Sequence, residues 1–455
     1  GAGGGAALSP MRMHSGLGGR VDWTFVAAVA GLVAAGTLAM LSAASTTIYY
    51  SAILQKHFIA LTLGAILFTL TVAFNYQIFQ DQSKFIYGVA LFILIAVLVV
   101  GATSRGHRAW FRFAGFSFQP AEFARVLTVL VLADLLDRRA ARQARDVSTV
   151  LMALAVAAPV MFLILKQPDY STALTFLPMI TGMLFCAGAD LFHLLLVFGY
   201  GVLTLSVPLV YTFCQTRFPG AAAGSLPALV LATSKMGWAT LSVVVCLGAL
   251  SAMAWRMATW MRLQVKPHLF LAVPVILSGS LLTGVALNRQ LKSYQRNRFV
   301  AFVAPHTDVQ GAAYNVIQSK VAIGSGGVWG KGLFSGTQSK LGFLPERHTD
   351  FIFANLGEEM GFLGTSLILG LYMVVLWRIV TAARQARDRY GYLVCAGLAS
   401  MFAFVMALNI GMCVGLMPVA GIPLPLISYG GSSLVINLWS LGIVANIYAR
   451  RYALL

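Results

Sequence analysis

Long apolar runs separated by short polar connections dominate the pattern of this chain. About twelve of these runs approach the roughly 20 apolar residues that a helix needs to cross a bilayer. The runs are continuous rather than alternating, which favours helices over a transmembrane barrel. We therefore predict an all-α polytopic transmembrane protein with spans at residues 23–44, 56–74, 84–101, 121–137, 148–166, 171–188, 191–213, 227–255, 268–288, 351–378, 391–416 and 430–448.

The longest polar interval, residues 289–350, precedes the last three predicted spans. It is rich in glycine and basic residues, and its first carboxylate is Asp308. The neighbouring carboxylates along the chain are the distant Asp190 and Glu346. Packing alone gives a membrane protein little reason to keep so long a polar loop between two spans. We expect this loop to carry the function.

Composition supports a single membrane domain over residues 21–451. Hydrophobic residues make up 59% of the chain and charged residues 10%, whereas a soluble domain carries about 25% charged residues. We expect residues 1–20 to be an artificial leader followed by a cytoplasmic N-terminal tail. The five cysteines are scattered, and no pair has the spacing of a metal or redox site.

The formal net charge of +18 would suggest a nucleic-acid partner in a soluble protein. Here many of the basic residues lie in short loops, where they set orientation and meet anionic lipid, so no nucleic acid is expected. With the N-terminus in the cytoplasm, twelve spans place the C-terminus there too. The short arginine-rich segments that then face the cytoplasm are 138–145, 256–266, 378–389 and 450–451.

Two basic segments fall outside under this topology, the loop around Arg108 and the loop 289–350. Long loops escape the positive-inside rule, so the topology survives. An anionic ligand is the obvious reason for positive charge on the outer side.

Charged residues within or beside predicted spans form two further candidate sites, because such residues usually mark function. Glu122 and Arg125 lie three residues apart in FSFQPAEFARV and share one helix face. Lys166 and Asp169 flank a proline that breaks the helix in KQPDYST. For Glu122 and Arg125, a purely structural ion pair has about the same weight as a functional site. For Lys166 and Asp169, a simple turn with snorkelling charges has about the same weight as a functional site.

Glycines in the large loop offer a third candidate, in the sequence IGSGGVWGKG. Backbone N–H groups there could approach an anion closely, with Lys331 supplying charge. The pattern is not a P-loop, and a plain flexible loop is the commoner reading.

Further along, His348 and Asp350 stand at the entry to the next span, and Glu358 and Glu359 follow inside it. These glutamates could form a proton relay or pair with interior arginines. Asp308 is the best general-base candidate, since nearby cations would keep it ionised. From physics alone, an ordinary turn residue is the simpler reading of Asp308.

Four blocks of sequence stand in the order of a known family. They are FSFQPAEF, KQPDYSTA, the block from YNVIQSKVAIGSGG to LPERHTDFIF, and PLPLISYGGSSL. Together they resemble the SEDS family of shape, elongation, division and sporulation proteins.

This resemblance implies a peptidoglycan glycosyltransferase in the bacterial cytoplasmic membrane, with both termini cytoplasmic and the large loop extracytoplasmic. Such enzymes polymerise lipid II into undecaprenyl-linked glycan strands, with a class B penicillin-binding protein as the transpeptidase partner. The resemblance places the family's essential loop aspartate on Asp308, which would activate the acceptor 4-hydroxyl.

A divalent cation such as Mg²⁺ or Mn²⁺ could help to stabilise the leaving pyrophosphate, while no organic cofactor is expected. No metal ligands are assigned. The residues expected to bind substrate are Arg108, Trp110, Glu122, Arg125, Lys166, Asp169, Arg296, Arg298, Gln318, Lys331, His348, Asp350, Glu358 and Ser428.

The chain departs from the family pattern at several points. Val309 stands where the family usually has proline, Arg125 where it has lysine, and Ala109 where it has arginine. The family core has about ten spans, so residues 214–288 look like an inserted helix pair. GTQSKLGFLPERHTDFIF favours an elongation-type member, whereas GIPLPLISYGGSS also fits a division-type one. A lipid-linked precursor flippase and a non-catalytic scaffold remain alternatives.

Overall fold

The computed structural model describes most of the chain, and two of the predictions lie outside the described residues. These are the proposed base Asp308 and the expected leader and tail at residues 1–20. The described residues are 21–45, 50–104, 107–113, 116–139, 143–220, 222, 224–262, 267–305, 311, 313–344 and 346–452.

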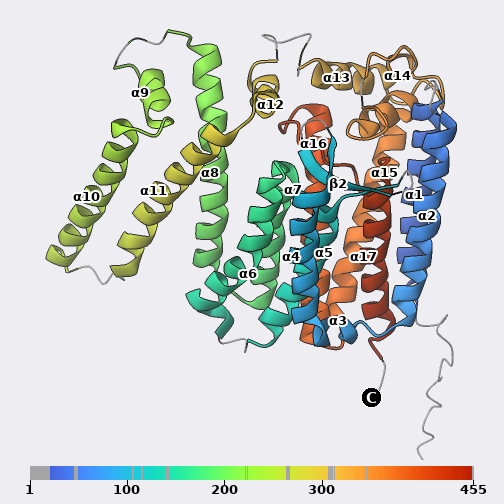
Figure 1. The fold of residues 1–455 in the computed structure, drawn as a ribbon, viewed down its shortest axis with the longest axis horizontal. Helices are drawn as coiled ribbons and strands as arrows, with labels where there is room; N and C mark the ends of the chain where they lie inside the picture. The colour runs from blue at the N-terminus through green and yellow to red at the C-terminus, as the bar shows by residue number, and fades with distance from the viewer. Residues whose placement is uncertain are drawn as a thin grey trace, which may run out of the picture.

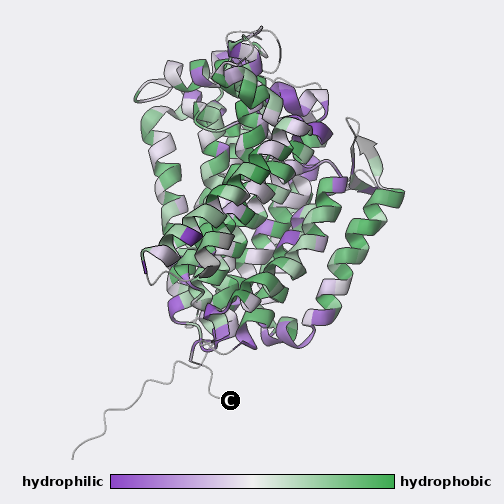
Figure 2. Cartoon of the chain, turned by 90° about the vertical axis from the view of Figure 1, so that its left-hand side faces the viewer, coloured by the Kyte–Doolittle hydropathy of each residue, from purple (hydrophilic) through white to green (hydrophobic). Residues whose placement is uncertain are grey.

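Across these residues the protein is a helical bundle, and 11 helices are long and apolar enough to cross a membrane. Hydrophobic residues predominate along the bundle, and hydrophilic residues gather towards its two ends (Figure 2). The predicted all-α polytopic fold is confirmed. The long apolar helices are α1 (Trp23–Ala44), α2 (Tyr50–Ala73), α4 (Ser83–Val100), α6 (Val147–Lys166), α7 (Tyr170–Ala187), α8 (Leu191–Arg217), α10 (Trp238–Trp260), α11 (Pro267–Gln290), α15 (Ile352–Arg384), α16 (Arg389–Val414) and α17 (Gly431–Ala449).

Helix α5 (Pro120–Asp137) matches the predicted span 121–137 but is not among those 11 helices, because it carries several ionisable residues. It lies inside the bundle against α4, α6, α7, α16 and α17. Neighbours supply partners for its charges at one end: Asp134 accepts from Ser83 Oγ (2.6 Å) and from Arg138 Nε (2.9 Å). Gln80 Nε2 donates to Asp137 over 2.8 Å.

The polar loop 289–350 is partly helical within the residues that the structure describes. It contains α12 (Ser293–Val303), α13 (Tyr314–Gly326) and α14 (Thr337–Lys340). These helices lie at one end of the bundle, opposite the C-terminus and α3 (Gln77–Asp81) (Figure 1). Helix α13 packs on α15 and α16 and buries Val316 and Ala322, so apolar contacts hold this part of the loop in place.

Helix α15 is interrupted at the point where it packs against this loop. Gly361 has φ 63° and ψ −163°, which interrupts the helix. The two N–H groups that follow donate to the loop instead, Phe362 N to Gly327 O (2.9 Å) and Leu363 N to Val328 O (3.1 Å). A Cβ on Gly330 would lie 2.2 Å from Glu359 O, so only glycine permits this approach.

A small antiparallel sheet precedes α5, within the segment expected as a loop between two spans. Its three strands, in the order β1-β2-β3, are β1 (Ala102–Ser104), β2 (His107–Phe113) and β3 (Phe116–Phe118). The run HRAWFRF is rich in aromatic residues, which favour strands, but it is too short and too charged for a search for long apolar runs to find.

The predicted span 227–255 is also wrong in its bounds, because residues 234–237 divide it. A short helix, α9 (Leu226–Thr233), comes first and α10 follows. Helices α9, α10 and α11 stand to one side of the bundle, and α11 packs against α8 (Figure 1). A short 3₁₀ helix, η2 (Gln143–Arg145), precedes α6.

We predict that Gly330→Ala lowers the thermal stability of the detergent-solubilised protein. The residue has φ 82° and no space for a Cβ, and strain of this kind costs about 1–3 kcal/mol. Gly324→Ala is the matched control, because it lies in α13 with no atom near its added Cβ and should be neutral or slightly stabilising. Equal melting temperatures for the two variants would contradict the packing role of Gly330.

Candidate functional site

A cavity of about 710 Å³ lies at the end of the bundle that carries α12. Its walls come from β2, from the first residues of α5 and α7, from α8, α11 and α12, and from residues 418–433 before and at the start of α17. Elements from both halves of the chain therefore meet around one space, as expected of a ligand site in a helical bundle.

One side of the cavity is polar and holds two carboxylates in fixed positions. Asp169 caps the start of α7 by accepting from Thr172 N (3.1 Å), and it also accepts from Gln119 Nε2 (2.7 Å). Glu122 accepts from Ser432 Oγ over 3.2 Å. Arg125, one turn along α5, is buried and interacts electrostatically with both carboxylates. The spacing of Glu122 and Arg125 thus places their charges beside the cavity.

A second group of charges lies where α12 meets the loop before α17. Arg298 Nη1 donates to Ala420 O over 3.0 Å. Gly421 has φ 70°, and a Cβ there would lie 3.1 Å from Arg298 Nη2 and 3.4 Å from Asp350 Oδ2. This glycine lets the guanidinium and the carboxylate approach the same point. Nearby, burial raises the pKa of the Tyr294 hydroxyl above its ordinary value.

The other side of the cavity is apolar. Leu205 and Leu209 of α8 line it together with Leu287, near the C-terminal end of α11, and Leu291, just beyond that helix. The cavity is therefore amphipathic, with carboxylates and a guanidinium facing a leucine-rich wall. Such a space suits a ligand that joins a charged group to a hydrocarbon chain.

The structure brings together several of the residues predicted to bind substrate. The ones that line the cavity are Trp110, Glu122, Asp169, Arg298 and Asp350.

Three more support the cavity from behind: Arg125, His348 and Ser428. The His348 ring packs against the cavity residue Tyr429, with centroids 5.9 Å apart. Ser428 Oγ donates to Thr349 O (2.7 Å) and accepts from Leu424 N (2.8 Å), which holds the loop before α17.

Four other predicted residues do not line this cavity. Arg108 is exposed on β2, and Gln318 lies on α13. The ammonium of Lys166 lies 5.3 Å from the centre of the Phe162 ring, at the exposed end of α6. Arg296 Nη2 donates to Asn288 O (3.3 Å) near the C-terminus of α11, where a cation is favourable.

Lys331 and Glu358 form an ion pair with each other, and neither residue lines the amphipathic cavity. Lys331 Nζ lies 2.8 Å from Glu358 Oε1, and the Glu358 side chain is fully buried. Glu358 also accepts from Thr337 Oγ1 (2.9 Å) and Gln338 N (3.0 Å). The backbone N–H of Lys331 donates to Glu358 O (3.0 Å), so the proposed anion cradle is occupied by α15.

Sequence reasoning missed several residues of the cavity. Gln119 and Ser432 lie inside the blocks FSFQPAEF and PLPLISYGGSSL, so a closer reading of these blocks would have found them. Tyr294 and the leucines of α11 gave no comparable signal, because their role depends on how α11 and α12 pack.

The described residues contain no group of three or more His, Cys, Asp or Glu side chains placed to hold a metal ion. The expected divalent cation therefore finds no ready protein site in that part of the chain.

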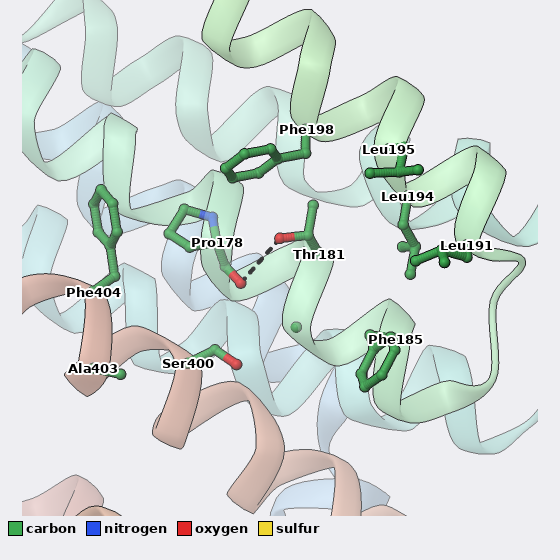
Figure 3. Close-up of a pocket in the computed structure, with 11 residues that line it drawn as sticks. Pro178, Thr181, Phe185, Leu191, Leu194, Leu195, Phe198, Ser400, Ala403 and Phe404 are labelled. Carbon is green, nitrogen blue, oxygen red and sulfur yellow. Dashed lines mark hydrogen bonds between the residues drawn. The ribbon is translucent and has the colours of Figure 1, made fainter. Parts of the chain in front are cut away.

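A second cavity, of about 470 Å³, lies between α7, α8 and α16 (Figure 3). Its lining is almost entirely apolar. The hydroxyls there are bonded to backbone carbonyls, Thr181 Oγ1 to Leu177 O (2.9 Å) and Ser400 Oγ to Ala396 O (2.9 Å). This cavity offers little to a polar substrate, so the amphipathic cavity is the candidate site.

Comparison with known families agrees with this geometry. A family model for cell cycle proteins, FtsW/RodA/SpoVE, matches residues 20–220 and 215–453. The chain belongs to the FtsW/RodA/SpoVE family. The SEDS resemblance seen in the four sequence blocks is thereby confirmed. Relatives with the elongation-type name RodA and with the division-type name FtsW both match this chain.

Two curated relatives illustrate the match. A Treponema pallidum protein named peptidoglycan glycosyltransferase RodA is 34% identical over 408 residues, which cover 87% of this chain and 89% of the relative. The Escherichia coli (strain K12) peptidoglycan glycosyltransferase MrdB is 30% identical over 391 residues, covering 86% and 84%.

Solved structures show the same fold. A chain from a peptidoglycan synthase complex has a TM-score of 0.63 at 30% identity and covers 95% of this chain and 98% of that chain. The rod shape determining protein RodA of Thermus thermophilus has a TM-score of 0.59 at 26% identity, covering 98% and 100%.

We predict that Lys331→Met strongly destabilises the protein, because it leaves the buried Glu358 carboxylate without its cation. Breaking a buried pair in this way costs about 3–5 kcal/mol. The double variant Lys331→Met/Glu358→Met removes both charges and should be clearly more stable than Lys331→Met alone. Thermal unfolding of the two variants in detergent tests this coupling. Strictly additive losses would show that the pair is not coupled.

Proposed function

We propose that this chain polymerises lipid II into glycan strands at the outer face of the cytoplasmic membrane during cell elongation. The enzyme is a peptidoglycan glycosyltransferase, the activity named for its relatives in Treponema pallidum and Escherichia coli. The observation that carries the proposal is the amphipathic cavity. Lipid II joins a polar sugar pyrophosphate to an apolar polyprenyl chain. The cavity has a polar wall and an apolar wall, which match these two parts of the molecule.

The proposed reaction uses Asp308 as general base. Its carboxylate accepts the proton of the acceptor sugar 4-hydroxyl, and that oxygen attacks the anomeric carbon of the donor. The bond from this carbon to the pyrophosphate oxygen breaks, and undecaprenyl pyrophosphate leaves. Asp308 follows Val303, the end of α12, by five residues, which extended chain spans in at most about 18 Å. The same helix carries Arg298 into the cavity, which supports this placement.

Arg298 is the proposed stabiliser of the leaving pyrophosphate. Its guanidinium lines the cavity and is held by Ala420 O, and a fixed cation is most effective where negative charge develops. A divalent cation would supply further charge. It would have to be bound largely by the phosphates, since the described residues hold no metal cluster.

We further propose an extracytoplasmic α12–α14 region, cytoplasmic termini and a class B penicillin-binding protein as partner. The short arginine-rich segments support the orientation. One structural relative is a peptidoglycan synthase complex that coordinates polymerization and crosslinking, which supports a crosslinking partner.

Asp308→Asn should lower the rate of glycan synthesis from purified lipid II by about 10²–10⁴-fold, the usual contribution of a general base. Asp81→Asn, an exposed change in α3 at the other end of the bundle, is the control and should leave the rate unchanged. Normal polymerisation by Asp308→Asn would exclude this residue as the base. Lipid translocation in liposomes without polymer under any condition would favour a flippase.

Arg298→Met should reduce polymerisation by about 10²-fold or more, because it removes a cation from the leaving-group side of the cavity. Arg298→Lys should retain part of the activity, since it keeps the charge but not the planar donor. Arg296→Met is a matched control two residues away on α12, and its side chain packs on the Tyr211 ring (5.7 Å) instead of lining the cavity. Steady-state rates with lipid II measure all three, and equal losses for the two Met variants would contradict the assignment.

A further inference from the structure

Helix α11 lies in the region expected as an insertion and is fixed tightly to α8. A Cβ on Gly284 would lie 2.6 Å from Val207 Cγ2, so the two helices approach at this glycine. At the preceding residue, Thr283 Oγ1 lies 3.1 Å from Tyr200 Oη and 3.1 Å from Thr204 Oγ1. Small residues and hydroxyls of this kind hold helices together inside membranes.

On its other side α11 packs against α10, which contacts little else. Tryptophans Trp238 and Trp260 begin and end α10 and are 86% and 84% exposed. The helix has 23 residues, or about 35 Å, so the two indoles fit the two membrane interfaces. Helices α10 and α11 thus form a pair of helices of spanning length beside the bundle.

The C-terminal end of α11 reaches the amphipathic cavity. Leu287 and Leu291 line it, one helical turn apart, and Leu291 N donates to Leu287 O over 3.1 Å. They face the space together with Leu205 and Leu209 of α8. Immediately beyond them, α12 carries the cavity residue Arg298. The helix pair thus contributes apolar surface next to the place where a pyrophosphate would be held.

We propose that α11 recognises the polyprenyl chain of the lipid-linked substrate, with Leu287 and Leu291 contacting the isoprene units that follow the pyrophosphate. This inference rests on the function proposed above. The cavity volume falls in the range of sites for drug-sized ligands, so it holds only the first part of a long chain and the remainder lies among lipids. The two leucines set the preference for a long prenyl chain over a short one.

The test compares two donors, undecaprenyl-linked lipid II and an analogue that carries a single isoprene unit. Leu287→Ala/Leu291→Ala should raise KM for the undecaprenyl substrate roughly tenfold and leave kcat nearly unchanged, because it removes apolar contact with the chain. The KM for the short analogue should change little, since that chain does not extend along the wall. Leu287→Met/Leu291→Met, which keeps the apolar volume, should restore the preference.

The control is Val275→Ala/Leu282→Ala, which alters exposed residues of α11 that do not line the cavity. It should leave both KM values unchanged. An unchanged KM for the undecaprenyl substrate in the Leu287→Ala/Leu291→Ala variant, or an equal rise for both substrates, would overturn the inference. A wild-type protein that makes no polymer from either donor would instead overturn the proposed function itself, on which the inference rests.

Discussion

The structure depends on shielding the ionisable residues of α5 from lipid. A charged side chain within the hydrocarbon costs several kcal/mol unless protein or water surrounds it. Helix α5 carries Glu122, Arg125, Asp134 and Asp137. All residues of α5 are buried except Phe123, Leu135 and Asp137, which are partly accessible. Five spanning helices therefore gather around it. The same requirement puts Glu122 at the wall of the amphipathic cavity and Arg125 behind it, so the fold and the candidate site have one physical origin.

Much of this architecture could be predicted from the pattern of apolar residues. The first span was predicted at 23–44 and α1 is Trp23–Ala44, and the last was predicted at 430–448 and α17 is Gly431–Ala449. Such agreement is expected in lipid, where the backbone must satisfy its hydrogen bonds within a helix and the bilayer thickness sets its length. The spacing of Glu122 and Arg125 and the proline before Asp169 likewise pointed to residues that meet at the cavity.

Other features depend on contacts between distant segments, which local sequence does not show. Lys331 looked like an exposed loop cation, but its partner Glu358 is 27 residues away. The glycines around it looked like an anion cradle, although α15 uses the N–H groups of Lys331 and Gly332. Leu287 looked like any other leucine of a span until the packing of α11 on α8 placed it in the cavity.

The central claim is that the amphipathic cavity binds the lipid-linked substrate with its chain against the α8–α11 wall. Photocrosslinking tests it most directly, with a lipid II analogue that carries a diazirine on an early isoprene unit and with mass spectrometry of the labelled peptides. The account predicts labels on α8 and α11 near Leu205 and Leu287, competed by unlabelled lipid II. Competable labels confined to the second cavity, around Phe198 and Phe404, would contradict it.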